Sequence, residues 1–196
     1  MGIKTPEVAY SKREKFEKPD ECFTPKNAIL PLLDFIKHLN KDKLVIWDCA
    51  YGSGRLAEHF NDFGYDVVGF PQCDFLKPEL ENVVHGFDVI ITNPPYSIKD
   101  KFLERAFKIG KPFAFLLPTK ALGEQKRGEM FRKYGIQMIV PNERINFEIP
   151  SKKKSAWFHT SWFLYGWDLP SDLNFVNMQE LRDKFVNVAT GEGEGK

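Results

Sequence analysis

Short apolar runs alternate along the chain with amphipathic stretches of helical length. The apolar runs are bounded by polar, glycine or proline residues, as buried strands are, and lie at 44–48, 65–70, 87–92, 113–117 and 137–140. The amphipathic stretches place apolar residues three and four positions apart, as helices do, and lie at 26–39, 55–63, 98–109 and 121–134. Strands that alternate with helices predict an α/β fold, with a mostly parallel sheet and helices on both faces.

The pattern changes in the last third of the chain. Residues 144–147 and 157–167 are rich in aromatic and β-branched residues and predict an antiparallel hairpin at the edge of the sheet. After Pro170 the sequence is at best amphipathic. The expected organisation is a flexible N-terminal arm at 1–19, one domain at 20–168, and a C-terminal extension at 169–196 whose end is disordered.

The apolar run at 87–92 leads into Asn93, Pro94, Pro95 and Tyr96. Neither proline can donate a backbone hydrogen bond, and each disfavours helix at the residue before it, so this loop is expected to be stiff and extended. It would present an amide, free carbonyls and an aromatic ring at the end of a central strand, where open α/β sheets bind ligands. A plain proline turn is the structural alternative, but the complete tetrapeptide after a buried strand favours a functional loop.

A second loop with ligand-binding character follows the first predicted strand. Asp48 ends that strand, and Gly52 and Gly54 precede the predicted helix at 55–63. Glycines allow a close approach of backbone to a ligand, and a new helix presents free N–H groups. The loop lacks the lysine of a phosphate-binding P-loop and the third glycine of a dinucleotide fold, so ATP and NAD are disfavoured.

The residues before the first helix favour a helix start. Thr24 is a candidate N-cap for the predicted helix at 26–39, with Pro25 at its first position.

The glycine loop, followed by Asn93-Pro94-Pro95-Tyr96, resembles S-adenosylmethionine-dependent amino-methyltransferases, specifically the adenine-N6 DNA methyltransferases. The resemblance covers about residues 20–167. It implies the class I methyltransferase (Rossmann-like) fold and an enzyme that methylates the exocyclic N6 of adenine in DNA. Further motifs resemble small, phage-type members of the family: Asp20-Glu21-x-Phe23-Thr24-Pro25, Asp74-Phe75-Leu76, Arg144-Ile145-x-Phe147 and Ser161-Trp162-Phe163.

The resemblance also implies a role for individual residues. Those over the methionine part of the cofactor would be Phe23, Thr24 and Pro25. Those in the main cofactor cradle would be Asp48, Ala50, Gly52 and Gly54, with Asp74 and Phe75 at the cofactor's adenine ring. The catalytic loop would be Asn93, Pro94, Pro95 and Tyr96, with Asn93 also next to the cofactor. A second stacking wall for the target base would be Phe147, with Trp157 or Phe158 as alternatives.

These residue types fit methyl transfer to an amine without a metal. The side-chain oxygen of Asn93 and the carbonyl of Pro94 would each accept one of the two N–H groups, which aims the nitrogen lone pair. Tyr96 would stack on the base, which has to leave the duplex or come from a single strand. The four histidines show no metal-ligand spacing.

The chain departs from the family pattern in two places. An acid that binds the cofactor ribose usually ends the second strand, but Val68-Gly69-Phe70-Pro71-Gln72 contains no carboxylate. Gln72 is a neutral candidate substitute. The chain also lacks a separate large target-recognition domain.

Charge and composition bear on the partner and the compartment. The formal net charge is +1, so attraction to nucleic acid has to come from local patches. Residues 119–154 hold nine basic and four acidic residues, nine minus four or +5, which a solvated helix face explains equally well. Three scattered cysteines, no signal peptide and no membrane-length apolar run predict a soluble cytoplasmic protein. The expected DNA contacts in and beyond the basic segment are Lys120, Lys152, Lys153, Lys154, Trp157 and Phe158.

Two alternatives remain open at this point. The same chemistry serves RNA adenine, cytosine N4 or a glutamine side chain, although cytosine enzymes more often begin the tetrapeptide with serine. Glutamine-modifying enzymes usually carry an extra N-terminal helical domain. A catalytically inert methyltransferase-fold binding protein is the other alternative, supported by the missing ribose acid. The sequence does not indicate the oligomeric state.

Overall fold

The computed structural model describes residues 23–36, 44–71, 74–77, 86–147 and 158–189. The predicted arm at 1–19, the C-terminal end at 191–196, Gln72, Lys152 to Lys154 and Trp157 lie outside the described residues.

One seven-stranded sheet runs through the described part of the chain, in the order β2-β1-β3-β4-β6-β5-β7. Neighbouring strands are parallel, except that β6 is antiparallel to both β4 and β5. The sheet is therefore mostly parallel with one reversed strand inside it. Its strands are β1 Val45–Trp47, β2 Asp66–Val68, β3 Val89–Thr92, β4 Phe113–Pro118, β5 Gln137–Pro141, β6 Thr160–Tyr165 and β7 Leu173–Val176.

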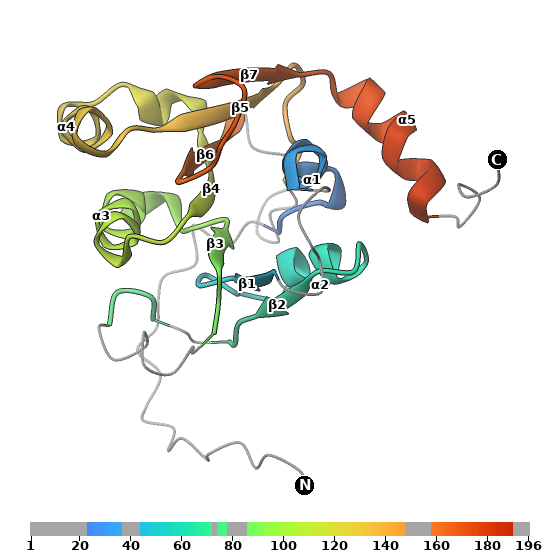
Figure 1. Cartoon of the computed structure of the whole chain (residues 1–196), viewed down its shortest axis with the longest axis horizontal. Coiled ribbons are helices and arrows are strands. Elements are labelled where there is room, and N and C mark those ends of the chain that lie inside the picture. Colours follow the sequence, from blue (N-terminus) through green and yellow to red (C-terminus); the bar gives the residue numbers. More distant parts are fainter. Residues whose placement is uncertain (1–22, 37–43, 72–73, 78–85, 148–157, 190–196) are drawn as a thin grey trace, which may run out of the picture.

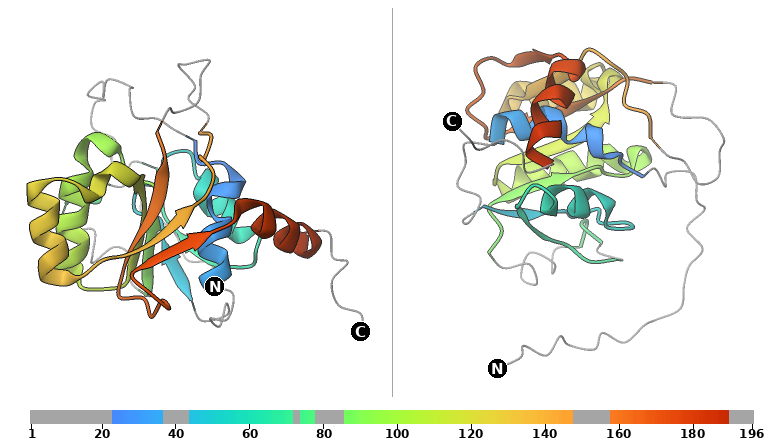
Figure 2. Two further views of the ribbon diagram at one scale, coloured as in Figure 1. Left: turned by 90° about the horizontal axis from the view of Figure 1, so that it is seen from above. Right: turned by 90° about the vertical axis from the view of Figure 1, so that its right-hand side faces the viewer.

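Helices cover both faces of the sheet and make a three-layered molecule (Figures 1 and 2). Helices α3 and α4 lie on one face, and α1, α2 and α5 lie on the other. The α-helices are α1 Leu30–Ile36, α2 Arg55–Asn61, α3 Lys99–Ile109, α4 Gln125–Tyr134 and α5 Met178–Ala189. Short 3-10 turns are η1 Lys26–Ala28, η3 Tyr96–Ile98 and η4 Thr119–Leu122.

Each face of the sheet has its own hydrophobic core, and β4 contributes to both. Ala114 and Leu116 belong to the core under α1, α2 and α5, whereas Phe113, Phe115 and Leu117 belong to the core under α3 and α4. Side chains alternate between faces along a strand, so a strand covered on both sides needs apolar residues at every position. This explains why β4 is an unbroken apolar run in the sequence.

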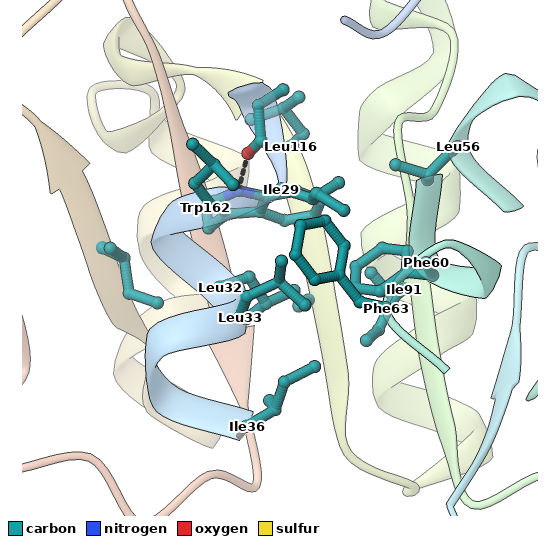
Figure 3. Packing of buried hydrophobic residues seen from close by; sticks show 14 of the residues in the cluster. Ile29, Leu32, Leu33, Ile36, Leu56, Phe60, Phe63, Ile91, Leu116 and Trp162 are labelled. Carbon is teal, nitrogen blue, oxygen red and sulfur yellow. Dashed lines mark hydrogen bonds between the residues drawn. The ribbon is translucent and has the colours of Figure 1, made fainter. Parts of the chain in front are cut away.

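Trp162 on β6 fixes the start of the chain's first helical segment against the sheet. Its indole N–H donates a hydrogen bond of 2.8 Å to the Ala28 carbonyl. Its ring is fully buried near Ile29 and Leu116 (Figure 3). Because residues 28 and 162 are far apart in sequence, this contact holds the segment before α1 next to the central strands.

The predicted edge hairpin is wrong, although the reversed strand exists. Strand β6 lies between β4 and β5, residues 144–147 form no strand, and β7 occupies the edge instead. The reason is burial: β6 is covered on both faces, from Thr160 to Leu164. Residues 173–176, expected in a C-terminal extension, pair with β5 in the same sheet.

Two helices begin at residues other than those that the sequence predicted. The first begins with η1 before α1, and its cap residue is Pro25, so the N-cap predicted at Thr24 is wrong. The Thr24 hydroxyl instead accepts a hydrogen bond from Asn93. The predicted helix at 121–134 is interrupted at Gly123, and α4 begins after Glu124, whose carboxylate accepts from the Arg127 backbone N–H.

The strand order creates a switch point between β1 and β3. The chain passes from β1 through α2 to β2 on one side of β1, and then continues with β3 on the other side. In the shared register Trp47 lies beside Ile90, so the residues that follow β1 and end β3 meet at one edge of the sheet. Open α/β sheets bind ligands at such a point.

Candidate active site

A hydrogen-bonded chain joins the ends of β1 and β3. The Thr92 hydroxyl donates to Asp48 Oδ1 at 2.6 Å, and the Ala50 backbone N–H donates to the same hydroxyl oxygen at 3.2 Å. Asp48 is 1% exposed and Thr92 is fully buried. The glycine loop is therefore fastened to the strand that carries Asn93.

Asp48 holds a buried charge with unused hydrogen-bonding capacity. Its second carboxylate oxygen, Oδ2, is buried and has no hydrogen-bond partner within the described residues. Burial raises the pKa of the Asp48 carboxyl to about 6, although hydrogen bonds from Thr92 and the Ala50 backbone act in the opposite direction. The group is mostly ionised at pH 7. An unsatisfied buried carboxylate oxygen is complementary to a positively charged or hydrogen-bond-donating ligand.

Asn93 combines one engaged and one available group. Its Nδ2 donates a hydrogen bond of 3.0 Å to the hydroxyl of Thr24, which is 5% exposed. Its Oδ1 is buried and has no partner among the residues that the structure describes. Pro94, the next residue, is also buried. Two sequence-predicted site residues, Thr24 and Asn93, are thus in direct contact.

Tyr96 forms an aromatic pair with Phe158. The ring centroids are 5.7 Å apart and the planes meet at 69°. Of the three candidates for a second aromatic wall, Phe158 is therefore the one that contacts Tyr96. Phe147 is 2% exposed and packs in the core on the α1 and α5 side of the sheet, and Trp157 lies outside the described residues.

Asp74 and Phe75 differ in their surroundings. Phe75 is 1% exposed, with its ring 5.4 Å from that of Trp47 and 4.9 Å from that of Phe102. Its ring is therefore part of the core between β1 and α3. Asp74 is exposed and accepts a hydrogen bond from the Leu76 backbone N–H.

Tyr51 lies within the glycine loop of the candidate site and was not among the residues predicted from the sequence. A Cβ atom on Gly54 would come within 2.9 Å of the Tyr51 ring, and one on Gly69 would come within 2.4 Å of it. The ring therefore lies against both glycines, and these glycines make room for a side chain of the same protein. The sequence signal was a bulky residue within the glycine loop. Gly69 directly follows β2, the strand that lacks the expected acid.

Two basic side chains of the segment 119–154 form ion pairs that stabilise the fold. Arg127 is 7% exposed and binds Asp100 at 2.7 Å, and Lys126 binds Glu104 at 2.5 Å, so both join α4 to α3. Lys120 is exposed on η4, and Lys152 to Lys154 are not described.

Among the described residues, no cluster of three or more histidine, cysteine or acidic side chains is arranged to hold a metal ion. The described helices also include none with the length and apolarity that a membrane crossing requires.

Comparisons with known proteins give structural likeness only. No family model matches the sequence, and no curated protein matches it. A predicted O-methyltransferase from Agrobacterium tumefaciens is similar with a TM-score of 0.42 and 14% identity, over 77% of this chain and 85% of that one. The M protein of the type I restriction enzyme EcoKI is similar with a TM-score of 0.49 and 14% identity, over 74% of this chain and 44% of that one.

A third similar structure is a modification subunit of a putative type I restriction enzyme from Vibrio vulnificus. It has a TM-score of 0.44 and 13% identity, over 89% of this chain and 54% of that one. The chain thus spans about half of each of these two restriction-enzyme subunits.

The sheet itself identifies the fold. Its strands are parallel from β2 through β1 and β3 to β4, the chain switches sides between β1 and β3, and the reversed β6 lies between β4 and β5. Helices cover both faces. This chain has the class I methyltransferase fold, as its sequence predicted.

Proposed function

We propose that this protein transfers a methyl group from S-adenosylmethionine to the exocyclic N6 of adenine in DNA. The observation that carries the proposal is the available oxygen of Asn93. It is buried at the end of β3, has no partner among the described residues, and immediately precedes the carbonyl-bearing Pro94. A pair of acceptors on neighbouring residues matches the two N–H bonds of an amine.

The residues at the switch point fit the cofactor in charge and in backbone. When bound, S-adenosylmethionine supplies a methyl group on a positively charged sulfur, which keeps the electrons of the broken S–C bond. The Asp48 carboxylate is ionised, and its Oδ2 has no hydrogen-bond partner among the described residues, so it complements the positive charges of the cofactor. The residues proposed to hold the cofactor are Phe23, Thr24, Pro25, Asp48, Ala50, Gly52, Gly54, Asp74 and Phe75, with Phe75 acting through its backbone because its ring is buried in the core.

The protein's role in the reaction is mainly orientation. The lone pair of an adenine amine is delocalised into the ring, so the amine is a poor nucleophile. Asn93 Oδ1 and the Pro94 carbonyl each accept one N–H bond, which localises the lone pair and directs it. The nitrogen forms the new N–C bond with that lone pair and gives up one proton to solvent.

The aromatic pair of Tyr96 and Phe158 supports an adenine-sized substrate. Tyr96 lies three residues after Asn93 in the same loop, and the Phe158 ring meets the Tyr96 ring edge-on, with the centroids 5.7 Å apart. A base that leaves the helix stack gains about 1–3 kcal/mol from stacking on an aromatic ring. Lys120, the lysines at 152–154 and Trp157 are proposed to contact the nucleic-acid backbone.

Methylation of separate nucleic-acid pools tests the proposal. The full chain is incubated with S-adenosylmethionine labelled on its methyl group and with single-stranded DNA, duplex DNA or RNA, and products are digested to nucleosides. We expect label in N6-methyl-2′-deoxyadenosine from DNA. Label only in RNA or only at cytosine N4 would overturn the substrate assignment and leave methyl transfer in place.

A catalytically inert binding protein is the second candidate. Two observations favour it: β2 is followed by Gly69, Phe70 and Pro71 without an acid, and the Tyr51 ring lies against Gly69. Calorimetry with S-adenosylmethionine separates the two readings. Binding of the cofactor supports the enzyme, and the absence of binding at millimolar cofactor supports the inert protein.

A further inference from the structure

Thr24 makes a contact with Asn93 that neither helix capping nor cofactor binding requires. Its hydroxyl oxygen accepts a hydrogen bond from Asn93 Nδ2 at 3.0 Å, and Thr24 is 5% exposed. The η1 turn that follows has Pro25 as its cap residue, and no side chain caps it. The hydroxyl is therefore committed to the catalytic loop.

An asparagine amide works in the proposed reaction in only one orientation. Its oxygen accepts hydrogen bonds, whereas its nitrogen donates them, and the two ends have nearly the same shape. With the oxygen toward an amine, two N–H groups find acceptors on Asn93 and Pro94. With Nδ2 toward the amine instead, the N–H groups of Asn93 would face the N–H groups of the substrate, and no hydrogen bond would form between them. Asn93 Oδ1 therefore has to be held toward the amine.

The structure assigns this to Thr24: we propose that it is a positioning residue whose bond to Asn93 Nδ2 keeps the Asn93 side chain in place, with Oδ1 toward the reacting amine. This inference rests on the proposed function. It is supported by the separate states of the two amide atoms, since Nδ2 is bound by Thr24 while Oδ1 is buried without a partner among the described residues.

The segment that carries Thr24 is held in place by one face of α2. The Arg55 guanidinium lies over the Phe23 ring, 4.4 Å from its centroid. His59 Nε2 lies 3.1 Å from the Thr24 carbonyl oxygen. Lys26 and Asp62, the C-cap residue that follows α2, form an ion pair of 2.8 Å. Arg55, His59 and Asp62 follow each other at spacings of four and three, so they share one side of the helix.

The far end of the same segment is also fixed, by the bond from the Trp162 indole to the Ala28 carbonyl. Contacts on both sides of Thr24 thus determine where its hydroxyl lies. A preorganised acceptor of this kind orients Asn93 before substrate arrives. His59, which has no metal-ligand spacing in the sequence, gains a defined role as a support of this segment.

Two substitutions separate positioning from cofactor binding. Thr24→Val keeps the shape of the side chain and removes the hydroxyl, and Thr24→Ser keeps the hydroxyl. With cofactor and DNA both saturating, we expect kcat to fall about tenfold or more in Thr24→Val. A factor of this size corresponds to the free energy of one hydrogen bond. Because its hydroxyl is bound to Asn93, Thr24 would contact the cofactor through its backbone or its methyl group, which Thr24→Val keeps. The Kd for S-adenosylmethionine by calorimetry should therefore stay within about twofold of wild type, and Thr24→Ser should restore most of kcat. A rise in Kd with an unchanged kcat would overturn the inference.

A comparison with a variant outside the site separates positioning from a general loss of stability. Tyr65→Phe removes a buried hydrogen bond to the Ile36 carbonyl and controls for general loss of stability. A fall in kcat of the same size in Tyr65→Phe would contradict a positioning role.

The side-chain amide of Asn93 gives a readout that needs no catalysis. In 1H–15N spectra of the full chain with cofactor, Thr24→Val should shift the Asn93 Nδ2 resonances, whereas Thr24→Ser should leave them near their wild-type positions. If this holds and wild type transfers no methyl group, the proposed function fails while the contact stands. If wild type transfers methyl groups and the resonances do not respond to Thr24→Val, the positioning role fails alone.

Discussion

The hydroxyl of Thr92 donates a hydrogen bond of 2.6 Å to the carboxylate of Asp48, across the neighbouring ends of β3 and β1. Both residues are buried, so this bond lies beneath the loop that begins at Asn93. It stabilises a negative charge in the protein interior, and that charge has consequences that stability measurements can detect.

Asp48 should make the protein less stable as pH rises from about 4 to about 6. Its pKa is raised from 3.8 to about 6 in the folded state, so the folded protein binds the proton more tightly than the unfolded chain does. This contribution to the free energy of unfolding is fully present below pH 3.8 and is lost through pH 6. Its ceiling is roughly 3 kcal/mol.

The measurement compares wild type with Asp48→Asn, which does not titrate. Urea unfolding at several pH values should show that the variant gains stability relative to wild type as pH rises across this window. The difference between the two proteins isolates Asp48 from other groups. A difference that is constant with pH would contradict the buried charge.

Thr92→Val should destabilise the fold, because it removes a hydrogen bond to the buried Asp48 charge. The expected loss is about 1.5–3 kcal/mol in the free energy of unfolding at pH 7. It should be smaller near pH 4, where Asp48 is neutral in the folded state. Urea titrations at both pH values check this, with Thr92→Ser as the variant that keeps the hydroxyl. An equal loss in Thr92→Ser would show that the methyl group matters instead.

Gly69→Ala should cost about 1–3 kcal/mol of stability, as overpacking does. The added Cβ would meet the Tyr51 ring at 2.4 Å and the Asp48 carbonyl at 2.8 Å. Combining it with Tyr51→Ala should recover only part of the loss, because the backbone contact remains. Thermal unfolding measures both effects. Gly128→Ala within α4 is the matched control, since its Cβ meets nothing closer than 3.7 Å and helix favours alanine. Equal effects at the two glycines would argue against the packing of Tyr51.

The sequence was sufficient for the layers and for which loops follow neighbouring strand ends. Unbroken apolar runs such as Phe113 to Leu117 predict strands covered on both faces, and the order of loops places Asp48 and Asn93 at neighbouring strand ends. The place of β6 in the sheet did not follow from local pattern. An apolar strand such as Thr160–Tyr165 fits either an edge or the interior until its neighbours are known, and the Trp162 bond to Ala28 joins residues far apart.

The contacts within the candidate site were harder to predict from the sequence than the residues that line it. Thr24 and Thr92 carry small hydroxyl groups that capping or burial already explains, so their bonds to Asn93 and Asp48 required the fold. Tyr51 lies in a loop whose glycines suggested a ligand, yet its own ring lies against Gly54 and Gly69. In each case a distant chain segment determined the partner.

Single-turnover transfer by wild type and Asn93→Ala tests the central claim most directly. Each protein is loaded with methyl-labelled S-adenosylmethionine, its cofactor Kd is measured by calorimetry, and an excess of adenine-containing DNA is added. We predict that wild type labels adenine N6, while Asn93→Ala binds the cofactor with nearly the same Kd and transfers no label. Transfer by Asn93→Ala at the wild-type rate would contradict the account.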